Sequence, residues 1–206
     1  MKRSMFTSAA LALAIAVCGA TSARAEWEWS PLGVGIAAPV QLPWTTSSIY
    51  GLRLTGLFGY NRDVYGVSWG VANATSSKAY SVEAGLFNAV FGEGAGLEFG
   101  LVNYNMTYAG LEIGGLNWNN ADSFGLDIGA VNANQAEFVG GQVGVIDYSM
   151  RISGGQIGVC NFADDVDGFQ IGFVNGCARM RGIQIGFINL ISEGPLPIMV
   201  VANANF

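Results

Sequence analysis

The stretch Gly168-Phe169-Gln170-Ile171-Gly172-Phe173-Val174-Asn175 returns fourteen residues later as Gly182-Ile183-Gln184-Ile185-Gly186-Phe187-Ile188-Asn189. Both copies follow one phrase: glycine, apolar, variable, apolar, glycine, apolar, apolar, asparagine. A phrase that recurs at a fixed short period is typical of a fold built by stacking one structural unit. The repeat therefore decides the architecture before any single residue is considered.

The same phrase can be followed along most of the chain in steps of fourteen or fifteen residues. The inner glycine recurs as Gly70, Gly85, Gly100, Gly114, Gly129, Gly144, Gly158, Gly172 and Gly186, and the final asparagine as Asn73, Asn88, Asn103, Asn117, Asn132, Asn161, Asn175 and Asn189, with Asp147 in that place once. We expect these residues to have structural roles, because each occurs once in every unit. The copies at the two ends, around Gly51 and Asn203, are degenerate, as the capping units of a repeat array usually are.

Apolar residues alternate with other residues inside each phrase, which is the periodicity of a β-strand. We predict an all-β parallel solenoid of about ten coils, in which equivalent residues stack about 4.8 Å apart. The asparagines would form a buried ladder at a corner, and the glycines would allow sharp bends. The alternative is an antiparallel up-and-down β-barrel with one phrase in each strand. Such barrels usually alternate short and long connections, so the uniform spacing favours the solenoid.

The variable residue of the phrase is acidic in four successive copies, at Glu83, Glu98, Glu112 and Asp127, and becomes glutamine from Gln142 onward. In a parallel stack these carboxylates form one column of like charges, which repel one another at that spacing. Three arrangements would relieve the repulsion: a polar outer face in water, divalent cations bound along the column, or antiparallel strands. We therefore retain the four acids as a candidate metal site for calcium, and we expect no other cofactor.

The N-terminal segment, residues 1–25, has the features of a secretory signal peptide. Lys2 and Arg3 give a positive start, and the apolar run Ala9–Ala20 is too short to span a bilayer. Ala23-Arg24-Ala25 supplies a small–x–small cleavage pattern. We therefore expect the chain to be exported.

Two further segments follow. Residues 26–49 contain Trp27, Trp29 and Trp44, which we expect to cap the open apolar end of the first coil. The alternative role for these rings is a patch that stacks on a ligand or contacts a membrane. Residues 50–206 form the β-repeat domain.

Composition excludes several classes of function. Beyond residue 25, fifteen carboxylates face six basic side chains, and this negative balance argues against binding to nucleic-acid phosphates. The chain has no histidine, the commonest catalytic base and a frequent metal ligand. The connections between phrases are also too short to build a catalytic cleft. We therefore expect a protein that is not an enzyme.

Two smaller features leave alternatives open. Cys160 and Cys177 could form a disulfide in an oxidising compartment or remain two small buried thiols. Asp164, Asp165 and Asp167 could ligate calcium, but their spacing fits a solvated acidic turn better.

The repeat resembles that of a group of poorly characterised bacterial surface-repeat proteins, which carry tandem Gly-x-Gln-Ile-Gly-x-x-Asn phrases behind a signal peptide. The resemblance rests on Tyr50–Leu54, on Val64-Tyr65-Gly66, on the full phrases and on the closing Pro195-Leu196-Pro197, and it covers Pro39 to Phe206. It implies an exported surface protein. It implies no activity, because the group is defined by its repeat.

These observations predict a non-catalytic, exported repeat protein with a structural or adhesin-like binding role. Its expected location is the cell surface, the outer membrane or the periplasm of a diderm bacterium. The expected partner is an envelope component or a surface ligand, association with a membrane is compatible with the sequence, and no oligomeric state is implied. The alternative function is a small outer-membrane β-barrel that acts as a pore or an anchor.

Overall fold

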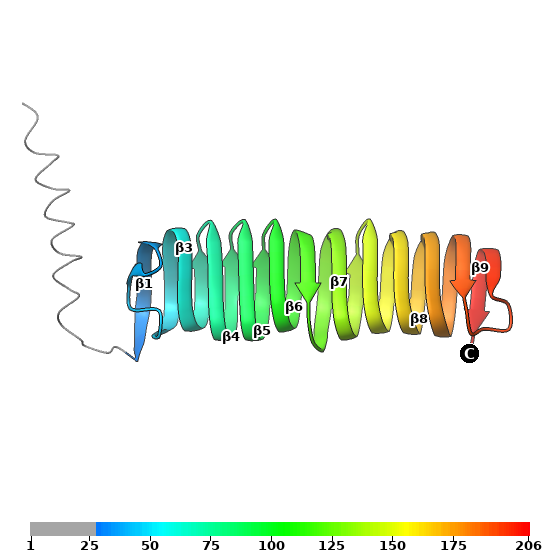
Figure 1. The fold of residues 1–206 in the computed structure, drawn as a ribbon, viewed down its shortest axis with the longest axis horizontal. Coiled ribbons are helices and arrows are strands. Elements are labelled where there is room, and N and C mark those ends of the chain that lie inside the picture. Colours follow the sequence, from blue (N-terminus) through cyan, green and yellow to red (C-terminus); the bar gives the residue numbers. More distant parts are fainter. Residues whose placement is uncertain (1–27) are drawn as a thin grey trace, which may run out of the picture.

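The computed structural model describes residues 28–206, which wind into one long rod (Figure 1). The predicted parallel β-solenoid is confirmed: the chain makes about nine turns, and the described residues contain no helix. The segment assigned to a signal peptide, residues 1–25, and Trp27 lie outside the described residues.

Nine strands build the rod, and the longer ones continue through more than one turn. They are β1 (Trp29–Ala37), β2 (Val40–Leu42), β3 (Ser48–Trp69), β4 (Ala72–Ala84), β5 (Phe87–Phe99), β6 (Val102–Asn119), β7 (Ser123–Val143), β8 (Ile146–Ile191) and β9 (Ile198–Asn205).

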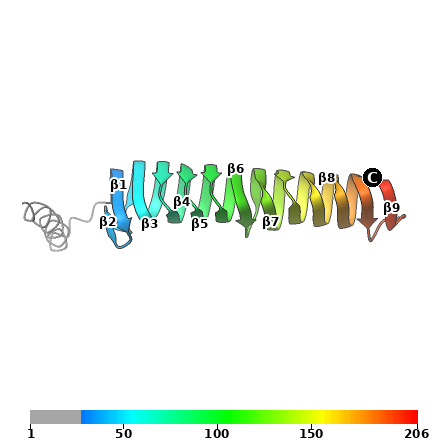
Figure 2. The ribbon, with the colours of Figure 1, turned by 90° about the horizontal axis from the view of Figure 1, so that it is seen from above.

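Successive turns pair in parallel and in register. Asn73 lies opposite Asn88 in the pairing of β4 with β5, and Glu98 lies opposite Glu112 in the pairing of β5 with β6. The antiparallel barrel alternative is therefore wrong, because it requires consecutive phrases to run in opposite directions. Antiparallel pairing occurs at the two ends of the described rod, where β2 pairs with β1 and β9 with β8 (Figure 2).

The stack begins before residue 50. β1 pairs in parallel with β3, with Leu32 opposite Leu52, so it already supplies a wall of the solenoid. Trp29 does not cover the open end: its side chain is 61% exposed, and its ring meets that of Tyr50 edge-on. The strand β2 lies at this end instead, where the buried Gln41 exchanges two hydrogen bonds with backbone groups of Tyr60.

We number the residues of each coil from position 1, the first glycine of the phrase, to position 14, the residue before the next phrase. In most coils of fifteen residues, the extra residue lies in the connecting segment and is left unnumbered. In the coil that begins at Gly168, Gln170 (position 3), Asn175 (position 8), Cys177 (position 10) and Met180 (position 13) are buried. These four positions point into the interior along the rod. The interior is thus polar on the side of positions 3 and 8 and mainly apolar on the side of positions 10 and 13.

Candidate functional surface

The buried asparagines at position 8 form ladders of side-chain hydrogen bonds. Each amide donates to the side-chain oxygen of the next coil at 2.7–3.0 Å, from Asn73 to Asp147 and again from Asn161 to Asn189. The amide also reaches a backbone carbonyl of that next coil, as Asn117 does at Ile128 (3.1 Å). A buried amide left without partners is costly, so these residues hold consecutive coils in register.

The glutamines at position 3 form a second ladder that runs the other way. From Gln184 back to Gln142, each Nε2 donates to the Oε1 of the preceding coil at 2.7–2.9 Å. Each also donates to a carbonyl of its own coil, as Gln156 does at Phe162 (3.2 Å). The C-terminal half of the interior is therefore held by two ladders of opposite polarity.

The four acids at position 3 continue the same interior column. Glu83, Glu98, Glu112 and Asp127 are stacked in parallel register, and each is at most 2% exposed. The expectation that they face water on a polar outer face is wrong. Alternation along a strand separates two faces but does not say which face is inside, and here the apolar residues of the phrase point outward.

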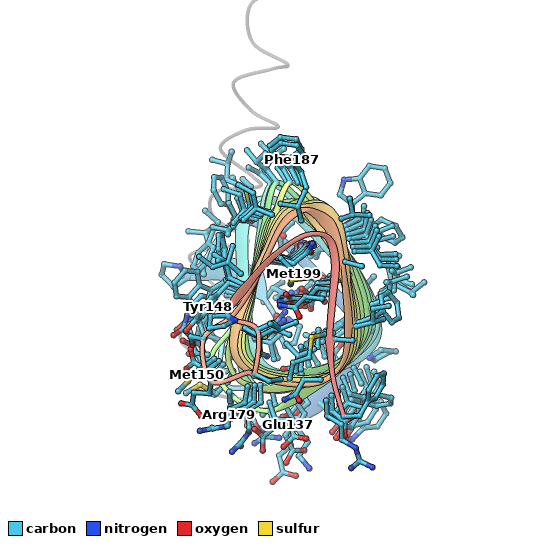
Figure 3. The ribbon with its side chains drawn as sticks, turned by 90° about the vertical axis from the view of Figure 1, so that its right-hand side faces the viewer. Glu137, Tyr148, Met150, Arg179, Phe187 and Met199 are labelled. Atoms are coloured by element: carbon cyan, nitrogen blue, oxygen red, sulfur yellow. The ribbon has the colours of Figure 1, made fainter. Side chains whose placement is uncertain are left out.

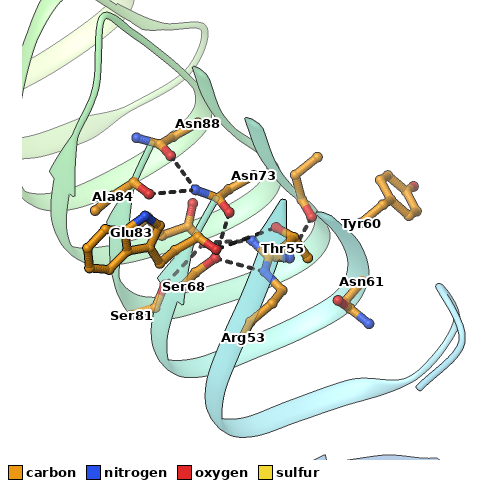
Figure 4. A network of polar contacts seen from close by, with 12 residues as sticks. Arg53, Thr55, Tyr60, Asn61, Ser68, Asn73, Ser81, Glu83, Ala84 and Asn88 are labelled. Carbon is orange, nitrogen blue, oxygen red and sulfur yellow. Dashed lines mark hydrogen bonds and ion pairs between the residues drawn. The ribbon is translucent and has the colours of Figure 1, made fainter. Parts of the chain in front are cut away.

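Arg53 enters the same column two coils before Glu83. Its Nε donates to Ser68 Oγ at 2.7 Å, and its Nη1 donates to the carbonyl of Ala74 at 2.9 Å (Figure 4). Its Nη2 lies 3.6 Å from Glu83 Oε1, because the small Ser68 side chain leaves room for the guanidinium to cross one coil. Burial raises the pKa of Glu83, and Arg53 opposes that rise. Sequence reasoning missed this partner, although Arg53 occupies the same phrase position as Glu83.

The next three acids are held by amides and by shared protons. Burial raises the pKa of Glu98 and of Asp127 well above the usual range, and the neighbouring Glu112 carboxyl adds to both rises. Asn105 donates to both Glu98 and Glu112, and Asn119 donates to both Glu112 and Asp127. The raised pKa values favour the protonated forms of Glu98 and Asp127 in the folded chain, and protonation removes the repulsion of a fully ionised column.

A cation at this column finds no support in the geometry. Among residues 28–206, no three acidic or cysteine side chains converge so as to hold a metal ion. The four candidate ligands form a stack along the axis of the rod, whereas calcium requires six to eight oxygens around one point.

Asp147 interrupts the asparagine ladder. Asn132 donates to Asp147 Oδ1 at 2.7 Å, but Asp147 has no amide with which to donate onward. Asp147 Oδ2 and Asn161 Oδ1, both beside Gly158, are consequently buried without a hydrogen-bond partner in the described part of the chain. Burial raises the pKa of Asp147 to about 6. Below that pH the protonated carboxyl can donate to Asn161 and complete the ladder.

We expect Asp147→Asn to raise the free energy of unfolding by about 1 kcal/mol at pH 8, the usual net value of one hydrogen bond. At pH 5 the gain should be smaller, because the protonated wild-type carboxyl then supplies the same donor. The sign follows from the raised folded pKa: the stability that Asp147 contributes is present below about pH 3.9 and is lost as the pH rises through about 6. Thermal melts of both proteins at the two pH values measure this, and an equal gain at both would contradict it.

Outside the coils, positions 2, 4, 6 and 7 form what we call the apolar faces. From Leu52 to Ile188, no side chain at these positions is charged or carries an amide or hydroxyl group. They are solvent-exposed: Leu86, Leu101 and Phe187, all at position 6, are 53%, 57% and 59% exposed. In the view along the rod they form stacked rows, with Phe187 at one apex (Figure 3). Contiguous apolar surface of this extent is unusual on a protein surrounded by water.

Outward-facing charge gathers at the opposite edge of the rod, at position 12 and at neighbouring positions such as those of Asp164 and Arg181. We call the row at position 12 the charged edge. Position 12 carries a charged side chain in every coil from Asp63 to Glu193, except at Thr107. Glu137 and Arg179 mark this edge in Figure 3. Members of opposite charge pair across coils, as Arg179 and Glu193 do at 3.7 Å. Exposed pairs of this kind add little to the free energy of unfolding. The charged edge therefore matters mainly as the side of the rod that favours contact with water.

Aromatic side chains with polar tips flank the charged edge on both sides. Position 9 carries Tyr60, Tyr104, Trp118 and Tyr148 on one side, and position 14 carries Tyr50, Tyr65 and Tyr80 on the other. The hydroxyl of Tyr80 donates to Glu93 Oε2 at 3.1 Å, and the indole of Trp118 donates to Asn120 Oδ1 at 3.1 Å. Their polar tips thus meet the polar groups of the connecting segments that carry the charged edge.

Cys160 and Cys177 are free thiols, so no disulfide joins them. Cys177 points into the interior, whereas Cys160 lies at position 7 on an apolar face. The acidic turn at Asp164, Asp165 and Asp167 faces solvent. Asp165 lies at the charged edge and pairs with Arg179 at 2.5 Å, while Asp164 and Asp167 are exposed.

An open hollow of about 610 Å³ lies beside the charged edge. It forms around Gly94, which has no side chain at position 13, and its lining includes Glu93, Tyr108 and Phe124. Glu93 pairs there with Lys78 at 3.4 Å. The hollow is open, and two hydroxyls in its lining donate to backbone carbonyls, Thr107 to Gly92 at 3.2 Å and Ser123 to Ala121 at 3.1 Å.

Among the described residues, no helix combines the length and hydropathy needed to cross a bilayer. No protein-family model, curated protein or solved structure matches the chain.

Proposed function

We propose that this chain is a non-catalytic, exported rod of the bacterial cell envelope that binds another envelope component along its apolar faces. The observation that carries this proposal is the arrangement of the coil, in which polar side chains bond to one another inside while apolar side chains remain uncovered outside. Exposed apolar area on this scale is unfavourable in water, so the faces require a cover.

The repeated construction suits a rigid binding surface. The amide ladders tie each coil to the next, and identical positions recur along the whole rod. Solenoids use such extended, regular surfaces for binding, because each added coil adds an equivalent row of contacts. The leader-like pattern of residues 1–25 supports export, as does the resemblance to surface-repeat proteins.

The described side chains offer little for catalysis. The acids of the interior are buried and tied to amides or to Arg53, and the outward-facing acids lie on an open edge. The absence of histidine from the sequence removes the usual general base.

The proposal is tested by expressing the full chain in a diderm bacterium and separating cytoplasm, periplasm and envelope membranes. We expect the chain in the envelope fraction. A photo-crosslinking residue at Leu101, on an apolar face, should capture an envelope component more strongly than the same residue at Thr107, on the charged edge of the same coil. Recovery in the cytoplasm, or equal capture from both positions, would refute the proposed function.

A further inference from the structure

We propose that the component covering the apolar faces is lipid, and that the rod lies along a membrane surface with these faces in hydrocarbon and the charged edge in water. This inference rests on the proposed function and names its partner.

The extent of the apolar faces is the first argument. Positions 2 and 4 form one side of the rod, and positions 6 and 7 form the apex that Phe187 marks in Figure 3. A second rod, or any partner with one flat face, covers one side at a time and leaves the other in water. Fluid hydrocarbon covers the side and the apex together, along the full length.

The aromatic residues provide the second argument. Every tyrosine of the sequence except the buried Tyr108 lies at position 9 or 14, between the apolar faces and the charged edge. In Figure 3, Tyr148 lies on the flank between Phe187 and Arg179. Tyrosine and tryptophan concentrate at membrane–water interfaces because their rings are apolar and their tips are polar. On one flank these residues extend from Tyr60 to Tyr148, and on the other they occupy the first coils, from Tyr50 to Tyr80. Together they mark the level to which the rod would sink.

The interior provides the third argument. A structure enters hydrocarbon only if its polar groups find partners within it. Here the backbone of each coil bonds to its neighbours, and the ladder amides bond to one another inside. Amides also bind the acid column, and a few buried oxygens such as Asp147 Oδ2 stay unpaired among the described residues. The alternation of apolar residues outside with polar residues inside is the pattern of strands that face lipid.

The charged edge fixes the orientation. It runs from Asp63 to Glu193, parallel to the axis of the rod. A rod that crossed the bilayer would carry these charges through hydrocarbon, which is costly. A rod that lies in the plane of the surface keeps the whole charged edge in water, as amphipathic interfacial elements do.

Flotation of the full chain with phosphatidylcholine vesicles tests the proposal. We expect the chain to float with the vesicles, and about 1 M NaCl to leave binding unchanged, because the attraction is apolar rather than ionic. Leu101→Lys should weaken binding by about a hundredfold, the effect of a lysine placed in hydrocarbon. Thr107→Lys adds the same charge to the same coil at the charged edge and should leave binding within about twofold of the wild type. All variants share residues 1–25, so differences between them report on the rod, and circular dichroism verifies that each is folded.

Depth-dependent quenching gives an independent readout. In variants that keep a single tryptophan, either Trp69 at position 4 or Trp118 at position 9, acyl-chain-brominated phosphatidylcholine should quench Trp69 strongly and Trp118 weakly. Equal quenching, or no flotation, would overturn the proposal. Association of the rods without lipid in sedimentation would instead assign the faces to a second copy. Retention in cell envelopes without vesicle binding would refute this inference and leave the proposed function standing. Vesicle binding by a chain found in the cytoplasm would refute only the proposed function.

Discussion

Gly140→Ala is expected to lower the free energy of unfolding by about 4 kcal/mol, as the sum of backbone strain and overpacking. Gly140 occupies position 1 and has φ = +141°, a conformation that side chains rarely allow. A Cβ there would fall on the carbonyl oxygen of Gly125, which holds the same position one coil earlier. The clash is with backbone, so relieving it requires moving the two coils apart or changing the backbone locally to the conformation of Ser81, which holds position 1 without a positive φ. Either change strains the ladder bonds beside it.

The adjacent residue supplies the control for this substitution. Gly141 has no positive φ, and a Cβ on it would meet only the flexible Leu126 side chain, at 3.1 Å. Gly141→Ala should therefore change the free energy of unfolding by less than about 1 kcal/mol. Urea unfolding of the two variants and the wild type, followed by far-ultraviolet circular dichroism, makes the comparison. Similar midpoints for the two variants would mean that position 1 does not require glycine.

Replacing the three buried acids beyond Glu83, with Glu98→Gln, Glu112→Gln and Asp127→Asn together, is expected to stabilise the rod above neutral pH. Burial raises the pKa of all three acids in the folded state. Their contribution to wild-type stability is therefore complete below about pH 4, where they are protonated even when unfolded, and is lost as the pH rises through their folded pKa values. Each pKa unit of rise corresponds to about 1.4 kcal/mol. The amides stay neutral and reproduce the ladder chemistry of Gln142 onward.

The wild-type melting temperature should thus fall as the pH is raised from 4 to 9. That of the triple variant should fall less, by the part that the remaining Glu83 and Asp147 cause. A matched control removes three carboxylates from the charged edge, through Glu93→Gln, Asp122→Asn and Glu137→Gln, and should keep the wild-type slope. If the edge variant flattens the pH profile as much as the column variant does, net charge rather than the buried column is responsible. The same melts with added calcium test the cation hypothesis directly.

The parallel stack could be predicted because asparagine and glycine each recur at a spacing of fourteen or fifteen residues. The hydrogen bonds of a buried Asn117 are satisfied by the equivalent asparagines of the coils before and after it. The glycine that recurs at the position of Gly114 is explained by the close approach of the coils there. The position of the acid column could not be predicted from the same pattern. Alternation places Ile183 and Ile185 on one face of the strand without saying which face is inside, and both lie on the outside.

One signal in the sequence could have corrected this. The column at position 3 changes from Glu112 and Asp127 to Gln142 while position 4 stays apolar. Glutamine that repeats in register is better explained by a buried ladder than by a wet surface, and the acids share its position. The pairing of Arg53 with Glu83 needed the structure, because it depends on the small Ser68 between them.

The ends of the rod differ from its middle, and this difference bears on how such a molecule changes in evolution. β9 crosses the last coil in the opposite direction, so a further unit appended there would meet a mismatched partner. Duplication or loss of one fourteen-residue unit within the glutamine ladder, between Gln142 and Gln184, would create no new kind of ladder contact. The length of the rod can therefore change in steps of one coil. The area that a single molecule covers changes with it.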